Sequence, residues 1–367
     1  MPSTASVSAG PSNSWVFAVD GFKSSEKVYP VVEIAAVIEA MSLESIAHKD
    51  LLARVRLSKA ALTSPRTRIS MDQLLDCFAY AAGHAPDPFF AYRAGLRLHV
   101  SAFGAYGFAL LSNTDYRQTM NFAETYHRLV TPLTDIYFTE ESGSGVWSFV
   151  PAVHEKIDKL VYRFIVEMGF GITLSLHRDV MGPSFRPREL RFANPKPPNA
   201  PEYEQVFGTA VIFGRERNEF VFDAAWLDGT PMLANEISYA SLRDICKSKL
   251  AELKSMEGVS GRVRQTVTEN IARSLSFEQV AQMLNMSART LRRRLEDENT
   301  SYRQICDYLR MKMAIRYLRD TRLTVDQIAD ALGFSDSANF RHAFHRWTSA
   351  SPHSFRGERL AGTQREA

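Results

Sequence analysis

The sequence predicts an α+β N-terminal domain followed by an all-α domain that has two helix-turn-helix units joined by a long helix. Three observations lead to this prediction. A segment near the C-terminus repeats at an offset of 48 residues, and an amphipathic helix pattern separates the two copies. The preceding two thirds of the chain combines helix patterns with alternating strand patterns. A length of 367 residues suits two or three domains of this kind.

Composition limits the class of protein. The chain is 45% hydrophobic and 23% charged, as expected of a soluble globular protein, and no apolar run reaches the ~18 residues of a membrane span. The start of the chain is small and polar, so we expect a disordered tail over 1–23 and no signal peptide. Cys77, Cys246 and Cys306 are few, odd in number and far apart, which excludes a disulfide framework or zinc pattern and favours the cytoplasm.

Residues 24–247 are predicted to form the α+β domain. Helix patterns cover 28–43, 49–62 and 70–83, and Ser70 with Gln73 resembles a capping box at the start of the third. Residues 86–114 continue as a helix, a glycine-containing corner and a second helix. Strand patterns follow at 135–152, broken at Gly143–Gly145 as in a hairpin, and at 188–195 and 218–227. Prolines and asparagines between 193 and 202 predict an irregular crossing.

The last third of the chain has a net positive charge, whereas the rest has a net negative charge. From Ser260 onward there are 18 Lys and Arg against 12 Asp and Glu, whereas the rest of the chain has 26 against 29. The last third is therefore the part expected to meet a polyanion. Residues 237–256 have a helix pattern, and 248–264, which ends in glycines and small polar residues, is the predicted linker to this region.

The repeat consists of residues 277–295 and 325–344. In the first copy Val280, Ala281 and Leu284 lie on one face of a short helix. A residue that tolerates positive φ follows in each copy, Asn285 and then Gly333. Ser287 and Ser335 come next as expected N-caps of a second helix. This order is typical of a helix-turn-helix, whose second helix enters the DNA major groove.

The second helix of each copy has a polar outer face. In the first, Leu291 and Leu295 mark the buried side, so Arg289, Arg292 and Arg293 point outward, as suits contacts with guanine edges and phosphates. In the second copy the expected core residues are Phe340, Phe344 and Trp347, and the expected outward residues are Ser337, Ala338, Arg341, His342 and His345. One such unit alone could be an ordinary αα-hairpin with a solvated basic face. Two units at a fixed offset favour DNA recognition.

Residues 300–318 join the two units. Apolar side chains at 302, 305, 309, 313 and 317 predict one amphipathic helix of about five turns. A helix of this length would hold the units at a fixed separation. We expect both recognition helices to enter successive major grooves on one face of the duplex, ~34 Å apart.

The second unit resembles the AraC/XylS family of transcription regulators. Residues 333–356, GFSDSANFRHAFHRWTSASPHSFR, match the signature stretch of that family, and the resemblance covers 265–360, leaving a tail at 361–367. It implies a sequence-specific, DNA-binding transcription regulator that is not an enzyme and needs no metal or cofactor. Carried over by position, the base-reading residues fall on Arg289, Arg292, Arg293, Ser337, Ala338, Arg341 and His342. The predicted DNA-binding residues are Ser287, Arg289, Thr290, Arg292, Arg293, Ser335, Ser337, Arg341 and His342.

The sequence departs from the family pattern in the second unit. Arginine is usual where His342 stands, Lys or Arg is usual at His345, and glycine is common at Ser349. The second unit is therefore expected to hold DNA more weakly, and with some pH dependence because histidine changes charge near neutrality. Operator affinity that stays flat between pH 6 and 8 would contradict this hypothesis.

The front domain is similar to the arabinose-binding-type N-terminal domain of one AraC subfamily, through residues 91–114 and 201–231. The resemblance implies an effector-sensing and dimerisation domain, a small-molecule effector of unknown identity, a homodimer, and RNA polymerase as a further partner. Phe103, Tyr106 and Phe108 near Arg97 and His99 are candidates for an effector pocket, although an aromatic stripe is also typical of a core. A second candidate set for an acidic effector, which could equally be ordinary surface charge, is Tyr162, Arg163, His177 and Arg178.

Two other classes of function are disfavoured. An enzyme would need a catalytic motif. His154-Glu155 begins like a zinc-hydrolase helix, but Asp158 stands where the second histidine is needed. Gly143-Ser144-Gly145 lacks the third glycine of a dinucleotide-binding loop and does not open a helix. A nucleoid-type binder that ignores sequence would not need a front domain of this size. Binding governed by salt alone would favour that second class.

Overall fold

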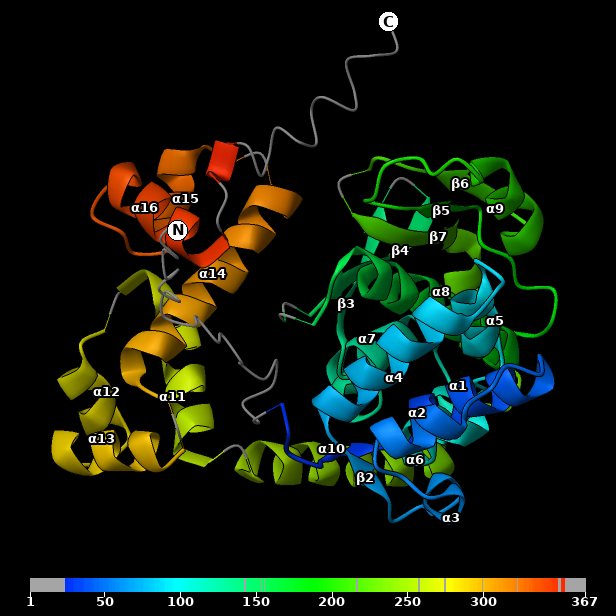
Figure 1. The fold of residues 1–367 in the computed structure, drawn as a ribbon, viewed down its shortest axis with the longest axis horizontal. Coiled ribbons are helices and arrows are strands. Elements are labelled where there is room, and N and C mark those ends of the chain that lie inside the picture. Colours follow the sequence, from blue (N-terminus) through cyan, green and yellow to red (C-terminus); the bar gives the residue numbers. More distant parts are fainter. Residues whose placement is uncertain are drawn as a thin grey trace, which may run out of the picture.

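The computed structural model describes residues 24–353, except 142, 153, 155, 216, 257, 274, 299, 322, 349 and 350. The predicted tails at 1–23 and 361–367 lie outside the described residues. Figure 1 shows two lobes: the front domain, and a helical lobe formed by the later part of the chain. None of the described helices combines the length and apolar character needed to cross a membrane.

The front domain contains a five-stranded sheet in the order β3-β4-β7-β5-β6. Its strands are β3 (Thr134–Glu141), β4 (Ser144–Pro151), β5 (Glu189–Arg191), β6 (Ala210–Ile212) and β7 (Asn218–Asp223). All neighbouring pairs are antiparallel except β5 and β6, which are parallel. The predicted hairpin is confirmed, with Gly143 at φ +77° in its turn. The strands expected at 188–195 and 218–227 are present but shorter, because β5 has three residues and a 3-10 turn follows β7. Strand β6 was not predicted.

Helices pack around this sheet and form most of the front domain. They are α1 (Val32–Leu43), α2 (Lys49–Arg54), α3 (Lys59–Leu62), α4 (Met71–His84), α5 (Phe90–Leu96), α6 (Ala105–Ser112), α7 (Tyr116–Tyr126), α8 (Lys159–Met181) and α9 (Ala200–Phe207). Short elements complete the domain: β1 (Tyr29–Pro30), β2 (Arg68–Ile69), and the 3-10 turns η1 (Val100–Phe103), η2 (His127–Leu129) and η3 (Ala224–Asp228). The capping box at the start of α4 is confirmed, since Ser70 and Gln73 exchange both bonds.

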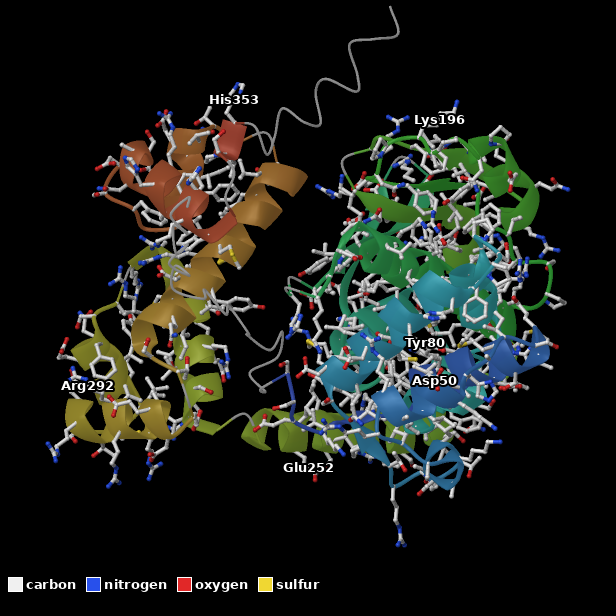
Figure 2. All side chains as sticks on the ribbon, viewed as in Figure 1. Asp50, Tyr80, Lys196, Glu252, Arg292 and His353 are labelled. Carbon is white, nitrogen blue, oxygen red and sulfur yellow. The ribbon has the colours of Figure 1, made fainter. Side chains whose placement is uncertain are left out.

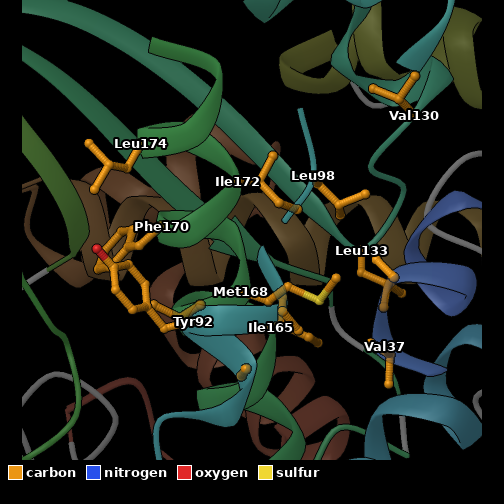
Figure 3. Packing of buried hydrophobic residues seen from close by; sticks show 14 of the residues in the cluster. Val37, Tyr92, Leu98, Val130, Leu133, Ile165, Met168, Phe170, Ile172 and Leu174 are labelled. Atoms are coloured by element: carbon orange, nitrogen blue, oxygen red, sulfur yellow. The ribbon is translucent and has the colours of Figure 1, made fainter. Parts of the chain in front are cut away.

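The long helix α8, which the sequence patterns did not predict, passes through the middle of the front domain. Its side chains Ile165, Met168 and Ile172 belong to the largest hydrophobic core, and Figure 3 shows them packed beside Leu98 and Leu133. Helix α8 is buried on several sides, with Phe164, Phe170 and Leu174 also enclosed. A helix that is apolar nearly all round lacks the one-sided pattern by which a surface helix is found in a sequence.

Helices α5 and α8 cross at a pair of glycines. A Cβ built on Gly171 would lie 2.9 Å from the backbone nitrogen of Leu96, and one built on Gly95 would lie 3.0 Å from the backbone nitrogen of Ile172. Both separations are tighter than at least nine in ten real Cβ contacts, so the two backbones touch only because neither residue has a side chain.

The predicted linker at 248–264 is helical on both sides of residue 257. Helix α10 (Glu236–Met256) packs against α6 of the front domain and buries Cys246 in its core. Helix α11 (Gly258–Glu269) buries Val259 and Val263 in a separate core that includes the first helix-turn-helix unit. Residues 258–264 therefore pack with the C-terminal lobe and are not an extended linker. Glycines at 258 and 261 led to the linker prediction, but Val259 and Val263 follow a helical period.

The C-terminal lobe has two small cores. It consists of α11, η4 (Ile271–Arg273), α12 (Phe277–Met283), α13 (Ala288–Asp297), α14 (Tyr302–Asp320), α15 (Val325–Ala331) and α16 (Ser337–Thr348). Ile305 and Cys306 of α14 belong to the core of the first unit, whereas Ala314 and Leu318 of the same helix belong to that of the second. Figure 1 shows α12 and α13 at one end of α14, and α15 and α16 at the other.

Candidate nucleic-acid interface

The first helix-turn-helix has the turn and cap that its sequence predicts. Asn285 adopts φ +55° after α12, and the Met286 N–H donates to the Ala281 carbonyl oxygen at 2.9 Å. The Ser287 hydroxyl oxygen then accepts from the Thr290 N–H at 3.1 Å and caps α13. The Thr290 hydroxyl lies 2.8 Å from that of Ser287, so these two side chains are joined to each other at the start of the helix.

The second helix-turn-helix repeats the turn but not the cap. Gly333 adopts φ +71°, and the Phe334 N–H donates to the Ala329 carbonyl oxygen at 2.9 Å. The cap predicted at Ser335 is wrong, because Asp336 supplies it by accepting from the Asn339 N–H at 2.7 Å. Helix α16 begins at Ser337, so Asp336 occupies the capping position and Ser335 lies one residue too early. The same bond from the Asn339 N–H holds the pKa of the Asp336 carboxyl below its usual range.

Helix α13 presents three arginines to solvent. Leu291 and Leu295 are fully buried, whereas Arg289, Arg292 and Arg293 are exposed, as the helical periodicity predicts. The guanidinium carbon of Arg292 lies 5.4 Å from the centre of the Phe277 ring, within the range of a cation–π interaction. Figure 2 shows Arg292 on the part of the lobe that faces away from the front domain. Exposed guanidinium groups on a helix are suited to bidentate contact with guanine and to phosphates.

Helix α16 presents a less basic face. Phe340 and Phe344 are buried, while Ala338, Arg341, His342 and His345 are exposed and Ser337 is half-buried. Ser335 is exposed just before the helix. Arg346 pairs with Asp307 of α14 at 3.3 Å and so helps to hold the two helices together. Arg341 is thus the one arginine among the predicted contacts of this unit.

The residues proposed as effector contacts do not form one site. Phe103 and Tyr106 line a partly enclosed cavity, but Phe108 is 46% exposed. Arg97 pairs with Glu39 at 2.7 Å and His99 with Asp179 at 2.9 Å, both at the surface. Their spacing in sequence suggested one site, but Arg97 and His99 are paired with other elements at the surface.

The second candidate set is also divided. His177 is buried and accepts a bond from the Trp147 indole N–H at 3.1 Å, and burial lowers its pKa to about 3, so the imidazole is neutral. Arg163 pairs with Glu167 at 3.6 Å, and the Tyr162 hydroxyl accepts from Asn218 at 2.7 Å. Arg178 donates to the Phe185 carbonyl oxygen. A neutral histidine gives no charge with which to hold an acidic effector.

Glu33, which sequence reasoning missed, faces the cavity that Phe103 and Tyr106 line. It lies within an apolar helix, and the only signal was a carboxylate on the buried side of that pattern. Among the described residues no group of three or more His, Cys, Asp or Glu side chains could hold a metal ion. The three cysteines are free and buried, and burial raises the pKa of the Cys77 thiol.

Comparison with known proteins agrees with this two-part arrangement. Residues 46–230 match the family described as the arabinose-binding domain of AraC transcription regulator, N-terminal, and residues 280–358 match a helix-turn-helix domain. The chain is 28% identical over 330 residues to the ornithine utilization regulator of Pseudomonas aeruginosa, covering 90% of this chain and 96% of that protein. The transcriptional regulator VqsM of the same species is 36% identical over 156 residues, or 42% of this chain and 48% of VqsM. The crystal structure of the regulator CdpR from Pseudomonas aeruginosa aligns with a TM-score of 0.47 at 21% identity, covering 89% of this chain and 98% of CdpR.

Proposed function

Because the chain belongs to the AraC family of transcription regulators and has the DNA-binding helix-turn-helix domain of that family, we propose that Arg289, Arg292 and Arg293 provide most of its base recognition. The observation that carries this proposal is the exposure of all three guanidinium groups on the face of α13 opposite Leu291 and Leu295. Arginine is the side chain most often used for specific contact with guanine in the major groove. Ser287 and Thr290, at the start of the same helix, would contact the phosphate backbone.

Helix α16 supplies the second and weaker part of this recognition. Its exposed face has Arg341 and His342 in place of an arginine cluster, with Ser335 and Ser337 at its start. A weaker second unit lowers affinity but still lengthens the sequence that is recognised. Both helices reading one face of the duplex, about 34 Å apart, would give two boxes one helical turn apart.

The front domain is proposed to sense a small-molecule effector and to form a homodimer in the cytoplasm. A dimer would place two DNA-binding lobes on two half-sites, and an effector that binds one arrangement better would shift the population toward it. Helix α10 connects the two lobes and packs on α6, so a change around α6 can alter where the DNA-binding lobe sits. RNA polymerase is the further partner expected of a regulator of this family.

The test is selection from a random DNA library by the purified full chain at a fixed salt concentration, because salt alone changes such affinities strongly. We expect an enriched motif with two boxes about one helical turn apart. Arg289→Ala should cost about 1–3 kcal/mol of binding free energy and relax one base position. The matched control is Arg66→Ala, which removes the same charge from an exposed site on the front domain.

The outcomes separate the alternatives. A motif that loses one base preference in Arg289→Ala, and none in Arg66→Ala, supports base recognition by α13. Equal enrichment of all sequences by the unaltered chain would mean binding by charge alone. An unchanged motif and affinity in Arg289→Ala would refute the assignment of this face.

A further inference from the structure

We propose that the Glu33 carboxylate binds the ammonium group of a small amine inside the front domain. The inference rests on the proposed sensing function, because it assigns that function a site and a chemical class of ligand. It begins with a partly enclosed cavity of about 60 Å³ that lies among α1, α4, α6, α8 and the first strands of the sheet. Val130, Leu133, Ile165, Met168 and Ile172, all shown in Figure 3, form part of its apolar wall.

Among the described residues that line this cavity, Glu33 is the one carboxylate. It is 6% exposed, and no hydrogen bond or ion pair joins its side chain to any residue that the structure describes. No lysine or arginine is found among the described residues of the cavity wall. A buried carboxyl group without a partner is costly, and native proteins rarely keep one without a purpose.

The protonation state of Glu33 without a ligand follows from these surroundings. Burial raises the pKa of Glu33 to about 8, so the group is a neutral acid at pH 7. The other titratable groups that face it are His127 of η2 and Tyr106 of α6, which line the same cavity, and Cys77 of α4, whose thiol senses the Glu33 charge. His127 lies with its Nε2 3.9 Å from the Asp135 carboxylate and its Nδ1 2.8 Å from the Glu124 carbonyl oxygen. Asp135 also pairs with Arg128 at 2.8 Å, so the charges beside His127 balance and leave no excess of positive charge that would attract an anion.

Aromatic rings supply the second argument for a cation. Phe78, Phe103, Tyr106 and Phe149 all line the cavity with Glu33. The negative faces of aromatic rings attract an ammonium group, and that attraction is larger when water is excluded. The hydroxyl groups of Thr131, Thr134 and Thr173 add neutral acceptors for ammonium N–H groups. An ammonium group bound here would therefore pair with the ionised Glu33 carboxylate, and it would also contact aromatic rings and neutral hydrogen-bond acceptors.

The size of the cavity limits the ligand. A volume of about 60 Å³ suits an ammonium group with a short chain, since a single water needs about 10–15 Å³ by the same measure. A second cavity of about 60 Å³ shares Tyr106, Ile136, Thr173 and Leu176 with the first. The second cavity is mostly apolar, so the chain of a longer amine could extend past these four residues.

The experiment uses the full chain and two probes of equal length, n-butylammonium and neutral 1-butanol, with calorimetry and thermal unfolding as readouts. We expect n-butylammonium to bind at least tenfold more tightly than 1-butanol at pH 7. Glu33→Gln, which keeps the size of the side chain, should remove that preference. Glu39→Gln is the control, because it makes the same change on the same helix at a residue paired with Arg97 at the surface.

Proton release gives a second readout. Glu33 must ionise to pair with ammonium, so binding at pH 7 should release close to one proton, detected as a dependence of the heat on the buffer. Affinity should rise about tenfold per pH unit from pH 6 toward 8, because the carboxyl group is increasingly ionised before binding. Neither effect should remain in Glu33→Gln.

Three results would overturn the proposal: equal affinity for the two probes, no saturable binding of n-butylammonium, or unchanged binding in Glu33→Gln. DNA affinity of Glu33→Gln is measured without probe in the same preparation. If Glu33→Gln still binds DNA but has lost the preference for ammonium, the cavity assignment is supported. If the unaltered chain binds DNA but shows no preference for ammonium, the cavity assignment is refuted and the DNA-binding function is unaffected. Loss of DNA binding by the unaltered chain would refute the proposed function instead.

Discussion

Arg262 and Arg310, which are 48 residues apart, occupy equivalent places in the two DNA-binding units. Arg262 of α11 donates to the Leu284 carbonyl oxygen at 3.4 Å, and Arg310 of α14 donates to the Leu332 carbonyl oxygen at 3.2 Å. Each carbonyl belongs to the residue that ends the first helix of a helix-turn-helix. The repeating unit therefore has three helices, and α14 is both the connection between units and the first helix of the second unit.

Removal of the Arg310 side chain should destabilise the second unit. Arg310→Ala leaves the Leu332 carbonyl oxygen without this donor and removes the guanidinium that lies 5.4 Å from the centre of the Phe334 ring. We expect a loss of about 1.5–3 kcal/mol of unfolding free energy, since a hydrogen bond that involves a charged group contributes about that much. Urea unfolding measures this change, and fluorescence anisotropy with operator DNA should show weaker binding.

The control for Arg310→Ala is Arg303→Ala, on the same helix. Arg303 is exposed, so its removal takes away one positive charge without breaking a described contact. Unfolding free energy should stay within about 0.5 kcal/mol. If both variants lost the same stability, the bond to Leu332 would not be the cause.

Phe277 should affect DNA affinity through Arg292. Phe277→Leu keeps an apolar side chain beside Tyr302 but removes the ring over which Arg292 lies at 5.4 Å. A partly exposed cation–π pair is worth about 0.5–1 kcal/mol, so operator affinity should fall about two- to fivefold. A double-mutant cycle with Arg292→Ala separates this effect from simple packing. Additive losses in the double variant would show that Phe277 does not act through Arg292.

The local parts of the DNA-binding units could be predicted because they depend on neighbours in sequence. Asn285 and Gly333 both adopt positive φ, and Leu291 and Phe340 are both buried, as their spacing indicates. Asp336 shows the limit of that reasoning. The repeat placed a cap at Ser335, but the second turn is one residue longer and a carboxylate takes the capping position.

The front domain was less predictable because its elements depend on distant partners. Helix α8 is enclosed by α5, α4 and the sheet, so it has no polar side to reveal its period. Strand β6 has three residues and is defined by pairing with β5. Glu33 became a candidate only when α1, α4, α8 and the sheet were seen to enclose one cavity.

The glycine crossing of α5 and α8 should be intolerant of any side chain. Gly171→Ala would place a Cβ 2.9 Å from the backbone nitrogen of Leu96, where only movement of a whole helix relieves the overlap. We expect a loss of about 1–3 kcal/mol of unfolding free energy, or failure to fold. Gly169→Ala is the matched control on the same helix, because its Cβ would lie in ordinary contact, 3.4 Å from the Phe149 ring. That variant should be neutral or up to about 1 kcal/mol more stable. Equal destabilisation of both variants would contradict the role of the crossing.

His177 should make the front domain less stable as the pH falls. Its folded-state pKa of about 3 lies below the ordinary value of about 6.5, because burial disfavours the charged imidazole. Between these values the unfolded chain binds a proton that the folded chain does not. Protons therefore favour unfolding in this range. Through His177 alone, the equilibrium constant for unfolding should rise about tenfold for each pH unit below 6.5. Above pH 6.5 both states hold a neutral imidazole, and the dependence should vanish.

His177→Gln isolates this contribution. At pH 7.5 the variant should be less stable than the unaltered chain, because the bond from the Trp147 indole and the stacking on Phe185 are disturbed. The gap should narrow at pH 5.5, since only the unaltered chain loses stability through His177. Glu33 and Glu167 have raised pKa values and titrate in overlapping ranges, but they are present in both proteins and cancel in the difference. Urea unfolding at pH 7.5, 6.5 and 5.5 measures the gap. A gap of constant size would mean that His177 takes up a proton equally well in the folded and unfolded states.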